Sequence, residues 1–212
     1  MNDITNLAAE SAPATIIRVT KLTDALAAAF FTLFTRSNSQ CFCQYWHFQG
    51  TKNEWLAELA EGGTHNREAA ADSIKNGTRT GLLALAGEEV VGWLKVEPKP
   101  QLVKLTGQSV YRKLALDQQA QTMVVGCMLV APEWRNRGVA RALLQHAPAF
   151  AIANGAHVLE AYPRVTDARL HEEEAFMGPA SVFTELGFKL VAGELPYPVL
   201  RLELGGQDGS QR

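Results

Sequence analysis

The spacing of hydrophobic and polar residues predicts a strand and three helices in the first part of the chain. Residues 15–20 are rich in β-branched side chains, which favours a strand. Residues 22–33 carry apolar side chains at intervals that place them on one face of a helix. Residues 53–61 and 66–75 predict two further helices, because a pair of glycines separates them and Asn-Gly follows the second.

The middle of the chain predicts three strands. Residues 82–86 and 89–96 flank a Gly-Glu pair, which is typical of a hairpin turn. Residues 101–117 mix apolar and basic side chains without a clear period, so we expect a loop with a short helix there. Residues 123–130 form an almost unbroken apolar run, which predicts a central strand buried on both faces.

A helix is expected after this central strand, from Val139 to the Asn154-Gly155 pair. Pro148 lies inside this helix and removes a hydrogen bond to the Leu144 carbonyl. The helix is therefore kinked at Pro148 or ends before it. The remaining predicted elements are a strand at residues 157–162, a helix at 180–186 and a strand at 199–204.

Length and composition predict one domain with one core. The chain has 212 residues, of which 47% are hydrophobic, and two complete domains would be small at this length. We expect a flexible lead at residues 1–13, a single domain at 14–204 and a flexible tail at 205–212.

Charge and cysteine content narrow the class of partners. The net charge of −2 provides no basic field for nucleic acid. No apolar run is long enough to span a membrane, and the N-terminal residues lack the pattern of a signal peptide. The 3 cysteines suit a reducing compartment better than a disulfide framework. These features predict a cytoplasmic protein and argue against nucleic acid and membrane as partners.

The segment between the central strand and the following helix carries the most informative motif. Arg135 and Gly138 precede the predicted start of the helix, and Ala140 follows it, in the pattern Arg-x-x-Gly-x-Ala. The first N–H groups of a helix have no intrahelical partner and favour an anion. Arg137 adds a further positive charge, and Gly138 lets a phosphate approach the backbone closely.

This motif resembles the acyl-CoA loop of the GCN5-related N-acetyltransferases (GNAT). The strand before the loop, the strand after the helix and the late Gly187-Phe188 pair follow in the order of that family. The resemblance implies an α/β fold of the α+β type, in which helices cover both faces of a mixed, mostly antiparallel sheet of about seven strands, with two central strands splayed apart. It also implies acetyl-CoA as cosubstrate, held at the following positions: Met128, Leu129, Val130, Arg135, Asn136, Arg137, Gly138, Val139, Ala140 and Arg141.

The chain departs from the family at the two positions that most often carry out proton transfer. Phe183 stands where many members have a tyrosine, and the central strand contains no carboxylate. Glu160 and Tyr162 alternate on the next strand and therefore share one face of the sheet. We predict Tyr162 as the acid and Glu160 as the base or amine-orienting group. The alternative is that Glu160 is solvated and Tyr162 packs in the core.

Aromatic and polar residues elsewhere are candidates for the acceptor site. Trp46 and Tyr45 follow the Cys41-Phe-Cys43 segment, and the corresponding region commonly covers the acceptor in the family. His171 lies beside three glutamates, and Tyr197 lies between two prolines, although a solvated helix face and simple packing are alternatives for these two. Cys41, Cys43 and His47 lack a fourth ligand at the spacing of a zinc site, so we expect packing and no metal.

The resemblance and the residues together predict an enzyme that transfers an acetyl group from acetyl-CoA to the amine of a small acceptor. A monomer or a homodimer is expected, with no nucleic acid and no membrane as partner. The alternative function is a non-catalytic module of the same fold that binds acyl-CoA, because the usual acid and base positions are empty.

Overall fold

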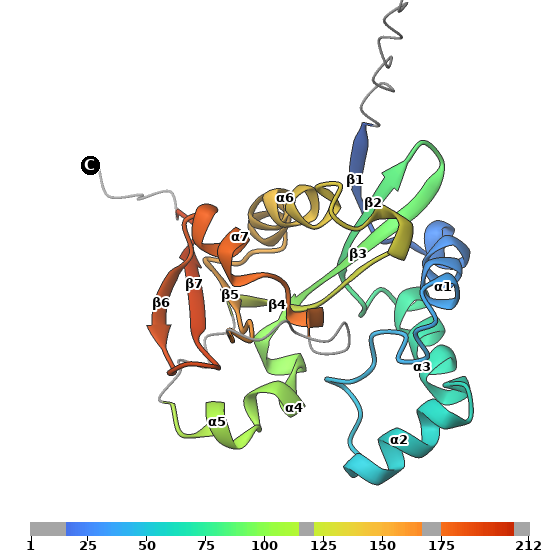
Figure 1. The fold of residues 1–212 in the computed structure, drawn as a ribbon, viewed down its shortest axis with the longest axis horizontal. Coiled ribbons are helices and arrows are strands. Elements are labelled where there is room, and N and C mark those ends of the chain that lie inside the picture. The colour runs from blue at the N-terminus through green and yellow to red at the C-terminus, as the bar shows by residue number, and fades with distance from the viewer. Residues whose placement is uncertain (1–15, 115–120, 167–174, 206–212) are drawn as a thin grey trace, which may run out of the picture.

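The computed structural model describes residues 16–114, 121–166 and 175–205. Its centre is a seven-stranded sheet with the order β1-β2-β3-β4-β5-β7-β6 (Figure 1). The pair β4 and β5 is parallel and every other neighbouring pair is antiparallel. The strands are β1 (Ile17–Lys21), β2 (Gly81–Ala86), β3 (Glu89–Pro98), β4 (Thr122–Val130), β5 (Val158–Ala161), β6 (Lys189–Ala192) and β7 (Val199–Glu203). The predicted mixed, mostly antiparallel sheet is confirmed.

Helices cover both faces of this sheet. The helices are α1 (Ala27–Arg36), α2 (Lys52–Ala60), α3 (Thr64–Lys75), α4 (Val103–Thr106), α5 (Ser109–Arg112), α6 (Val139–Ala153) and α7 (Ala180–Glu185). Single turns of 3₁₀ helix lie at Asp24–Leu26, Lys99–Gln101, Pro132–Trp134 and Ala175–Met177. None of the described helices has the length and apolar character that crossing a membrane requires.

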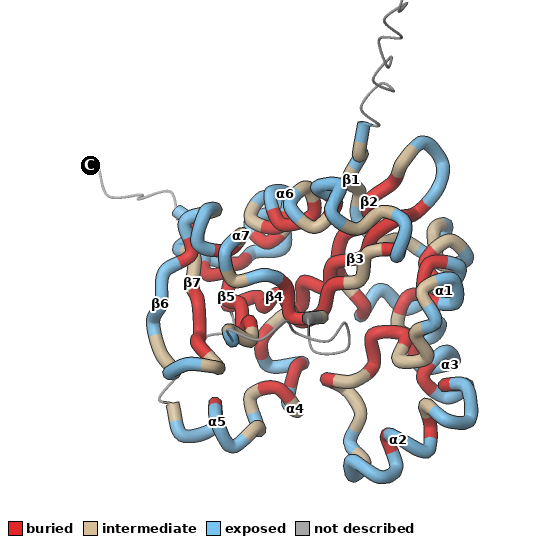
Figure 2. Tube along the Cα trace, viewed as in Figure 1, coloured by how far each residue is buried: buried red, intermediate tan, exposed pale blue. Residues whose placement is uncertain are grey.

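Alternation along the strands divides the core into two faces. Leu82 and Ala84 of β2 pack in the same cluster as α6 and α7, on what we call the first face. Leu83 and Leu85, which point the other way, pack against α1 and α3 on the second face. The short helices α4 and α5 pack near Val124 in a third cluster, also on the second face. Figure 2 shows the resulting buried band along the central strands.

The long helix α6 runs through Pro148 to Ala153. The alternative that this proline marks an earlier helix end is therefore wrong. A proline removes one intrahelical hydrogen bond, but Ala147 and Ala151 on either side of it are fully buried against the sheet. Packing of this apolar face holds the helix together across the missing bond.

Most other predicted elements are present with small shifts of their ends. The hairpin of β2 and β3, the strand β4, and the short helices between residues 101 and 114 are confirmed. The first helix begins later than expected, at Ala27, because a 3₁₀ turn precedes it.

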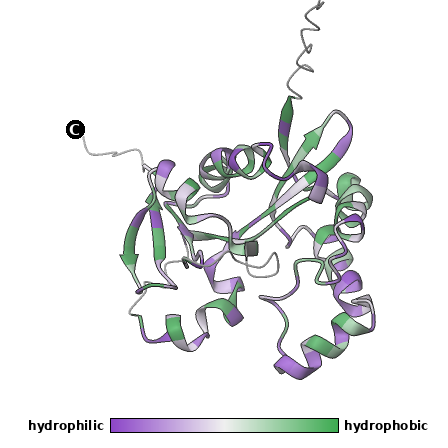
Figure 3. Cartoon of the chain, in the orientation of Figure 1, coloured by the Kyte–Doolittle hydropathy of each residue, from purple (hydrophilic) through white to green (hydrophobic). Residues whose placement is uncertain are grey.

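The edge strand β6 was not predicted as a separate element. Three of its four residues are exposed, so its side chains show no alternation of apolar and polar positions. It is largely hydrophobic in Figure 3 although it lies at the edge of the sheet. The predicted flexible lead and nearly all of the predicted tail lie outside the described residues, and the domain limits stay a prediction.

Candidate active site

The strands β4 and β5 diverge halfway along β4. Their parallel pairing runs from Thr122 and Val158 to Val125 and Ala161, where β5 ends. At this point the register with β3 also jumps, because Lys95 pairs with Cys127 and the next residue, Val96, pairs with Val125. The residue between them on β4, Gly126, is therefore a bulge, and bulges bend a strand. The predicted splay begins at this bulge.

The far end of β4 leads into the turn that opens α6. After the 3₁₀ turn Pro132–Trp134, Asn136 and Gly138 both adopt left-handed backbone conformations, with φ of 58° and 79°. Gly138 is the N-cap of α6, and no side chain caps this end of the helix. A Cβ at Gly138 would meet no atom within 4 Å. The start of the helix therefore has no side-chain cap and has open space beside Gly138, which suits an incoming phosphate.

The arginines of the turn are held in different ways. Arg135 donates from Nε to the Val130 carbonyl over 3.3 Å. The guanidinium of Arg137 lies 5.4 Å from the centre of the Trp134 ring. Arg141 forms an ion pair with Glu185 of α7 at 2.5 Å. Arg135 and Arg137 thus flank the turn, whereas Arg141 joins two helices.

The side chains of the other predicted donor-site residues differ in exposure. Val139 and Met128 are buried in the core of the first face, and Leu129, Val130 and Ala140 are half-buried. These residues can therefore contact a bound cosubstrate mainly through their backbone N–H and carbonyl groups.

Glu160 and Tyr162 lie together on the second face, as the alternation along the strand predicted. The Tyr162 hydroxyl donates to Glu160 Oε2 over 2.7 Å. Lys99 Nζ lies 2.9 Å from the same oxygen, and Arg201 Nη2 lies 2.7 Å from Oε1. Both side chains are buried, so the alternative of a solvated Glu160 is wrong. The carboxylate is shared between two cations and one hydroxyl.

The protonation of this pair is biased by its surroundings. Burial alone would raise the pKa of Glu160, but the hydrogen bonds from Tyr162, Lys99 and Arg201 outweigh it and lower the pKa. Burial and the neighbouring carboxylate both raise the pKa of Tyr162. In this state the phenol keeps its proton and directs it to Glu160, and the carboxylate stays ionised.

A second buried charged cluster lies directly beside the bulge. His47 Nε2 is 2.8 Å from Glu97 Oε2 and 2.7 Å from Lys95 Nζ, and the ammonium and carboxylate are 3.2 Å apart. Lys95 and Glu97 are almost fully buried, while the side chain of His47 is 29% exposed. The stem of Lys95 lies over Gly126, because a Cβ built there would be 3.0 Å from Lys95 Cδ.

The charges of this cluster fix its carboxylate in the ionised form. Burial would raise the pKa of Glu97, but Lys95, the hydrogen bond with His47 and the charge of Arg79 lower it to about 2. A neutral imidazole can accept a hydrogen bond at Nε2 from the ammonium, and a protonated one can donate to the carboxylate. The cluster therefore has a suitable partner for His47 in either protonation state.

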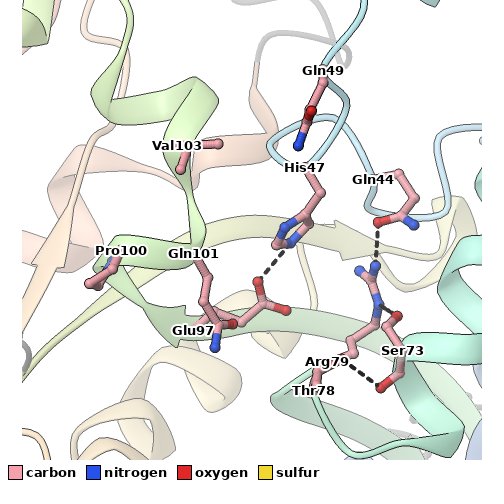
Figure 4. Close-up of a pocket in the computed structure, with 10 residues that line it drawn as sticks. All are labelled: Gln44, His47, Gln49, Ser73, Thr78, Arg79, Glu97, Pro100, Gln101 and Val103. Atoms are coloured by element: carbon pink, nitrogen blue, oxygen red, sulfur yellow. Dashed lines mark hydrogen bonds and ion pairs between the residues drawn. The ribbon is translucent and has the colours of Figure 1, made fainter.

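His47 and Glu97 also line a pocket of about 510 Å³ on the second face (Figure 4). This volume lies within the range of pockets that bind small molecules. Figure 4 shows the His47 ring directed toward Glu97, with Arg79 reaching toward Gln44. The pocket is lined by Gln44, His47, Gln49, Ser73, Thr78, Arg79, Glu97, Pro100, Gln101 and Val103.

The aromatic residues predicted for the acceptor site border this region without lining the pocket. The indole of Trp46 donates to the Gly126 carbonyl, so this residue anchors its segment to the bulge. Tyr45 packs edge-on against the Trp46 ring at 4.7 Å. Tyr197 is half-buried and packs at the margin of the third cluster. His171 lies outside the described residues.

The cysteines pack in the core of the second face. Cys43 is buried and accepts a hydrogen bond at Sγ from the Trp93 indole over 3.1 Å. Burial would raise the pKa of Cys43, but a hydrogen bond from Cys127 and the charges of Lys95 and Arg79 lower it to about 6. Within the described ranges no group of three His, Cys, Asp or Glu side chains is placed to hold a metal ion.

Sequence reasoning missed the charged residues that line this face. Lys95 and Glu97 alternate with apolar residues on β3 and follow Trp93 on the same side of the strand. Lys95 lies inside the predicted strand 89–96 and Glu97 directly follows it. Two charges that continue the alternation of an otherwise apolar strand are a usable signal, since such charges are rarely buried without partners. Arg79 lies outside any predicted element, and its sequence context gives no such signal.

Comparisons with known proteins agree with this geometry. The family model described as acetyltransferase (GNAT) family matches residues 25–175. No curated protein matched the sequence.

Three solved structures show the same fold at low sequence identity. The PaiA N-acetyltransferase from Thermoplasma acidophilum, in complex with coenzyme A, is 12% identical with a TM-score of 0.52, over 89% of this chain and 99% of that one. An N-acetyltransferase from Staphylococcus aureus Mu50 is 14% identical with a TM-score of 0.51, over 90% and 99%. The ribosomal-protein-S18-alanine N-acetyltransferase from Escherichia coli is 11% identical with a TM-score of 0.50, over 93% and 99%. The family match spans well over half of the sequence, and the chain belongs to the acetyltransferase (GNAT) family.

Proposed function

We propose that this acetyltransferase moves the acetyl group of acetyl-CoA to the amine of a small acceptor. The observation that carries the proposal is the course of β4. The strand leaves β5 at Gly126 and ends in a turn that opens α6 without a side-chain cap. A phosphate-binding turn and a free strand edge thus follow each other along one segment, as an extended cosubstrate with a pyrophosphate requires.

The donor side uses the main chain for most of its contacts. The pyrophosphate would lie against the first N–H groups of α6, with Arg135 and Arg137 on either side. The backbone N–H groups near Met128, Leu129 and Val130 belong to the part of β4 that β5 does not pair. Donors aimed at a developing oxyanion typically contribute about 3 kcal/mol each to acyl transfer.

The acceptor side would be the pocket beside His47 and Glu97. An amine attacks only in its neutral form, so a nearby base has to take its proton. His47 is partly exposed to the pocket, and Glu97 can stabilise the imidazolium that results. During transfer the N–C bond forms and the C–S bond breaks, and CoA leaves as the thiolate with the electron pair of that bond. The proton of the amine passes to the imidazole, from which it can return to the thiolate or to solvent. We propose His47 as this base.

The roles in proton transfer predicted for Glu160 and Tyr162 stay predictions. The carboxylate of Glu160 is fully engaged with two cations and the phenol. Release of a proton by Tyr162 would place two negative charges side by side in a buried site, which is unfavourable. These contacts favour a positioning role for the pair.

The first test of the proposal is a melting curve with and without acetyl-CoA. A ligand at about 100 times its dissociation constant stabilises a protein by about 2.7 kcal/mol. A clear rise of the melting temperature, followed by release of CoA that depends on an added amine, supports the proposal. Absence of any rise overturns the donor site.

A non-catalytic module that binds acyl-CoA is the second candidate. One observation favours it: Phe183, at the usual tyrosine position, is fully buried against Phe188 and offers no hydroxyl. A rise of the melting temperature with acetyl-CoA, but without CoA release for any amine, would support this candidate. A cytoplasmic location and a monomeric or homodimeric state also belong to the proposal; the free thiols of the described cysteines suit that location.

A further inference from the structure

The guanidinium of Arg79 is buried in the wall of the pocket and holds only neutral partners. It donates from Nε to Ser73 Oγ over 2.9 Å and from Nη1 to the Cys43 carbonyl over 3.0 Å. It also donates from Nη2 to the side-chain oxygen of Gln44. Arg79 is 4% exposed. Over the described ranges of the chain, no carboxylate lies within ion-pair distance of it.

The charges around the pocket do not balance. Lys95 and Arg79 are two buried cations, and Glu97 is the one carboxylate that faces them in the described structure. Glu97 is already paired with Lys95 at 3.2 Å. A buried charge without a partner is costly, so the pocket favours a ligand that brings a negative group to Arg79.

Arg79 also retains donors for such a group. A guanidinium has five N–H donors in a planar fork that matches the two oxygens of a carboxylate. Ser73, Cys43 and Gln44 take one bond from each of its three nitrogens. These bonds leave one N–H on Nη1 and one on Nη2 without a partner among these three residues. Because Arg79 lines the pocket, these two N–H groups are the candidate donors to a ligand.

The other end of the pocket is suited to an amine. His47 and Glu97 lie on the same wall and next to the stem of Lys95, which covers the bulge at Gly126. The amine end of the pocket is therefore the end closest to the splayed strands. An acceptor with an amine at this end and an anion at Arg79 would meet a complementary charge at both.

We infer that the acceptor is a small amine that also carries a carboxylate, as an amino acid does, with the carboxylate bound at Arg79 and the amine at His47. This inference rests on the proposed function, because it assigns the substrate class of the same site.

The test compares matched substrates on the wild-type protein. Phenylalanine, methionine and glutamine are each supplied as the free amino acid, as the carboxamide and as the decarboxylated amine, with acetyl-CoA as donor. CoA release is measured, and rates are corrected for the fraction of neutral amine. The free amino acids should have a kcat/KM about 100-fold higher than their carboxamides, because a charge-assisted bidentate pair is lost in the amides.

Two variants assign this preference to Arg79. In Arg79→Gln the kcat/KM of each free amino acid, divided by that of its carboxamide, should fall toward one. The fall should come mainly from a higher KM for the amino acid. Arg79→Lys keeps the positive charge but lacks the planar N–H donors of the guanidinium. In this variant part of the preference for the amino acid over its carboxamide should remain. Arg67→Gln is the matched control, since Arg67 is exposed and packs over the Phe31 ring away from this pocket. Stabilisation by acetyl-CoA shows that each variant is folded.

The outcomes separate the inference from the proposed function. Carboxamides or decarboxylated amines that react as well as the amino acids overturn the inference and leave the acetyltransferase standing. The same holds if acetyl-CoA stabilises the protein but no amino acid releases CoA faster than its amide. Absence of stabilisation by acetyl-CoA overturns the proposed function itself. If neither Arg79 variant folds, the substrate series on the wild-type protein decides.

Discussion

The proposed donor and acceptor sides of the splayed strands, which are called the donor side and the acceptor side below, are built from different parts of the chain. The donor side is one continuous segment, from the bulge of β4 through the turn to the start of α6, and its chemistry lies mainly in backbone N–H groups. The acceptor side is made of side chains from three separate segments, represented by His47, Arg79 and Glu97. A backbone site tolerates changes of most side chains, whereas a side-chain site changes its specificity with each substitution.

The two sides also differ in their electrostatics. The turn at Gly138 has open space beside it, an exposed Arg137 and a half-buried Arg135. Glu97 and Arg79, which line the pocket, are almost completely buried, and so is Lys95 beside Glu97. Buried charges cost free energy unless they are paired, so the stability of the acceptor side should depend on pH and the donor side should not. Substitutions on either side can separate these two behaviours.

The largest effect is expected for Gly138→Asp, which should abolish binding of acetyl-CoA. The substitution places a carboxylate where the pyrophosphate would lie, at a position with φ of 79°. Repulsion between two charges about 4 Å apart amounts to about 4 kcal/mol at an effective dielectric constant of 20, or about a thousandfold in Kd. Melting curves with acetyl-CoA measure the loss.

The matched control for this variant is Gly155→Asp. Gly155 follows the other end of α6, has φ of 78° and also meets no atom within 4 Å of a built Cβ. The same strain and the same charge are introduced there, and the response to acetyl-CoA should be kept. Equal responses in the two variants would remove the turn from the donor site.

The second prediction concerns the buried carboxylate of the acceptor side. The pKa of Glu97 in the folded state, about 2, lies below its ordinary value of 4.5. The stability that Glu97 contributes is therefore present above pH 4.5 and is lost as the pH falls toward 2. The shift corresponds to about 3 kcal/mol at neutral pH. Denaturant unfolding of the wild-type protein between pH 7 and pH 3 should show about 2 kcal/mol of this loss, because the folded-state carboxylate is still largely ionised at pH 3.

Two variants show whether the acid-sensitive stability belongs to the acceptor side. Glu97→Gln should be less stable at pH 7 and should depend less on pH than the wild type, because the titrating group is gone. Glu61→Gln, at an exposed glutamate, should behave as the wild type does. A pH dependence in Glu97→Gln that equals that of the wild type would assign the acid sensitivity to other carboxylates.

The third prediction tests the base on the acceptor side. His47→Gln should lower the turnover of CoA release by about 100-fold, the usual contribution of a general base. Stabilisation by acetyl-CoA should be unchanged, because the donor side does not include this residue. The rate of the variant should also rise with pH in the range where the free amine of the acceptor loses its proton.

The control for this prediction is His146→Gln, at an exposed histidine whose ring contacts the Ala142 carbonyl within α6. This variant should keep full turnover. A His47→Gln variant with wild-type turnover would move the base to Glu160 or to solvent.

The same contrast explains what could be predicted from the sequence. The strand β4, the turn at Gly138 and the helix after it are encoded by neighbouring residues, so an apolar run and a short motif were sufficient to predict them. The splay of the strand was expected only from the family resemblance. The shared face of Glu160 and Tyr162 followed from strand alternation alone. The contacts of Glu160 with Lys99 and Arg201 did not follow, because they join residues far apart in the sequence.

The pocket was beyond sequence reasoning for the same reason. His47 was considered only as a metal ligand beside two cysteines, and its partners Lys95 and Glu97 come from β3. The register of β3 against β4 brings them to the bulge, and register depends on tertiary pairing. Strand β6 was missed because its few exposed residues show no alternation.

The smallest effect is expected for Tyr162→Phe, and this variant decides between acid and positioning roles. The phenol already donates its proton to Glu160, and that carboxylate raises the pKa of Tyr162. Removing the hydroxyl should change turnover by less than about threefold and should lower stability by about 2 kcal/mol, as for other hydrogen bonds to charged groups. Tyr111→Phe is the control, because the Tyr111 ring packs against Tyr162 at 4.9 Å without a role in that bond. A fall of turnover by about 100-fold in Tyr162→Phe, with binding of acetyl-CoA intact, would instead establish Tyr162 as the acid that protonates the leaving thiolate.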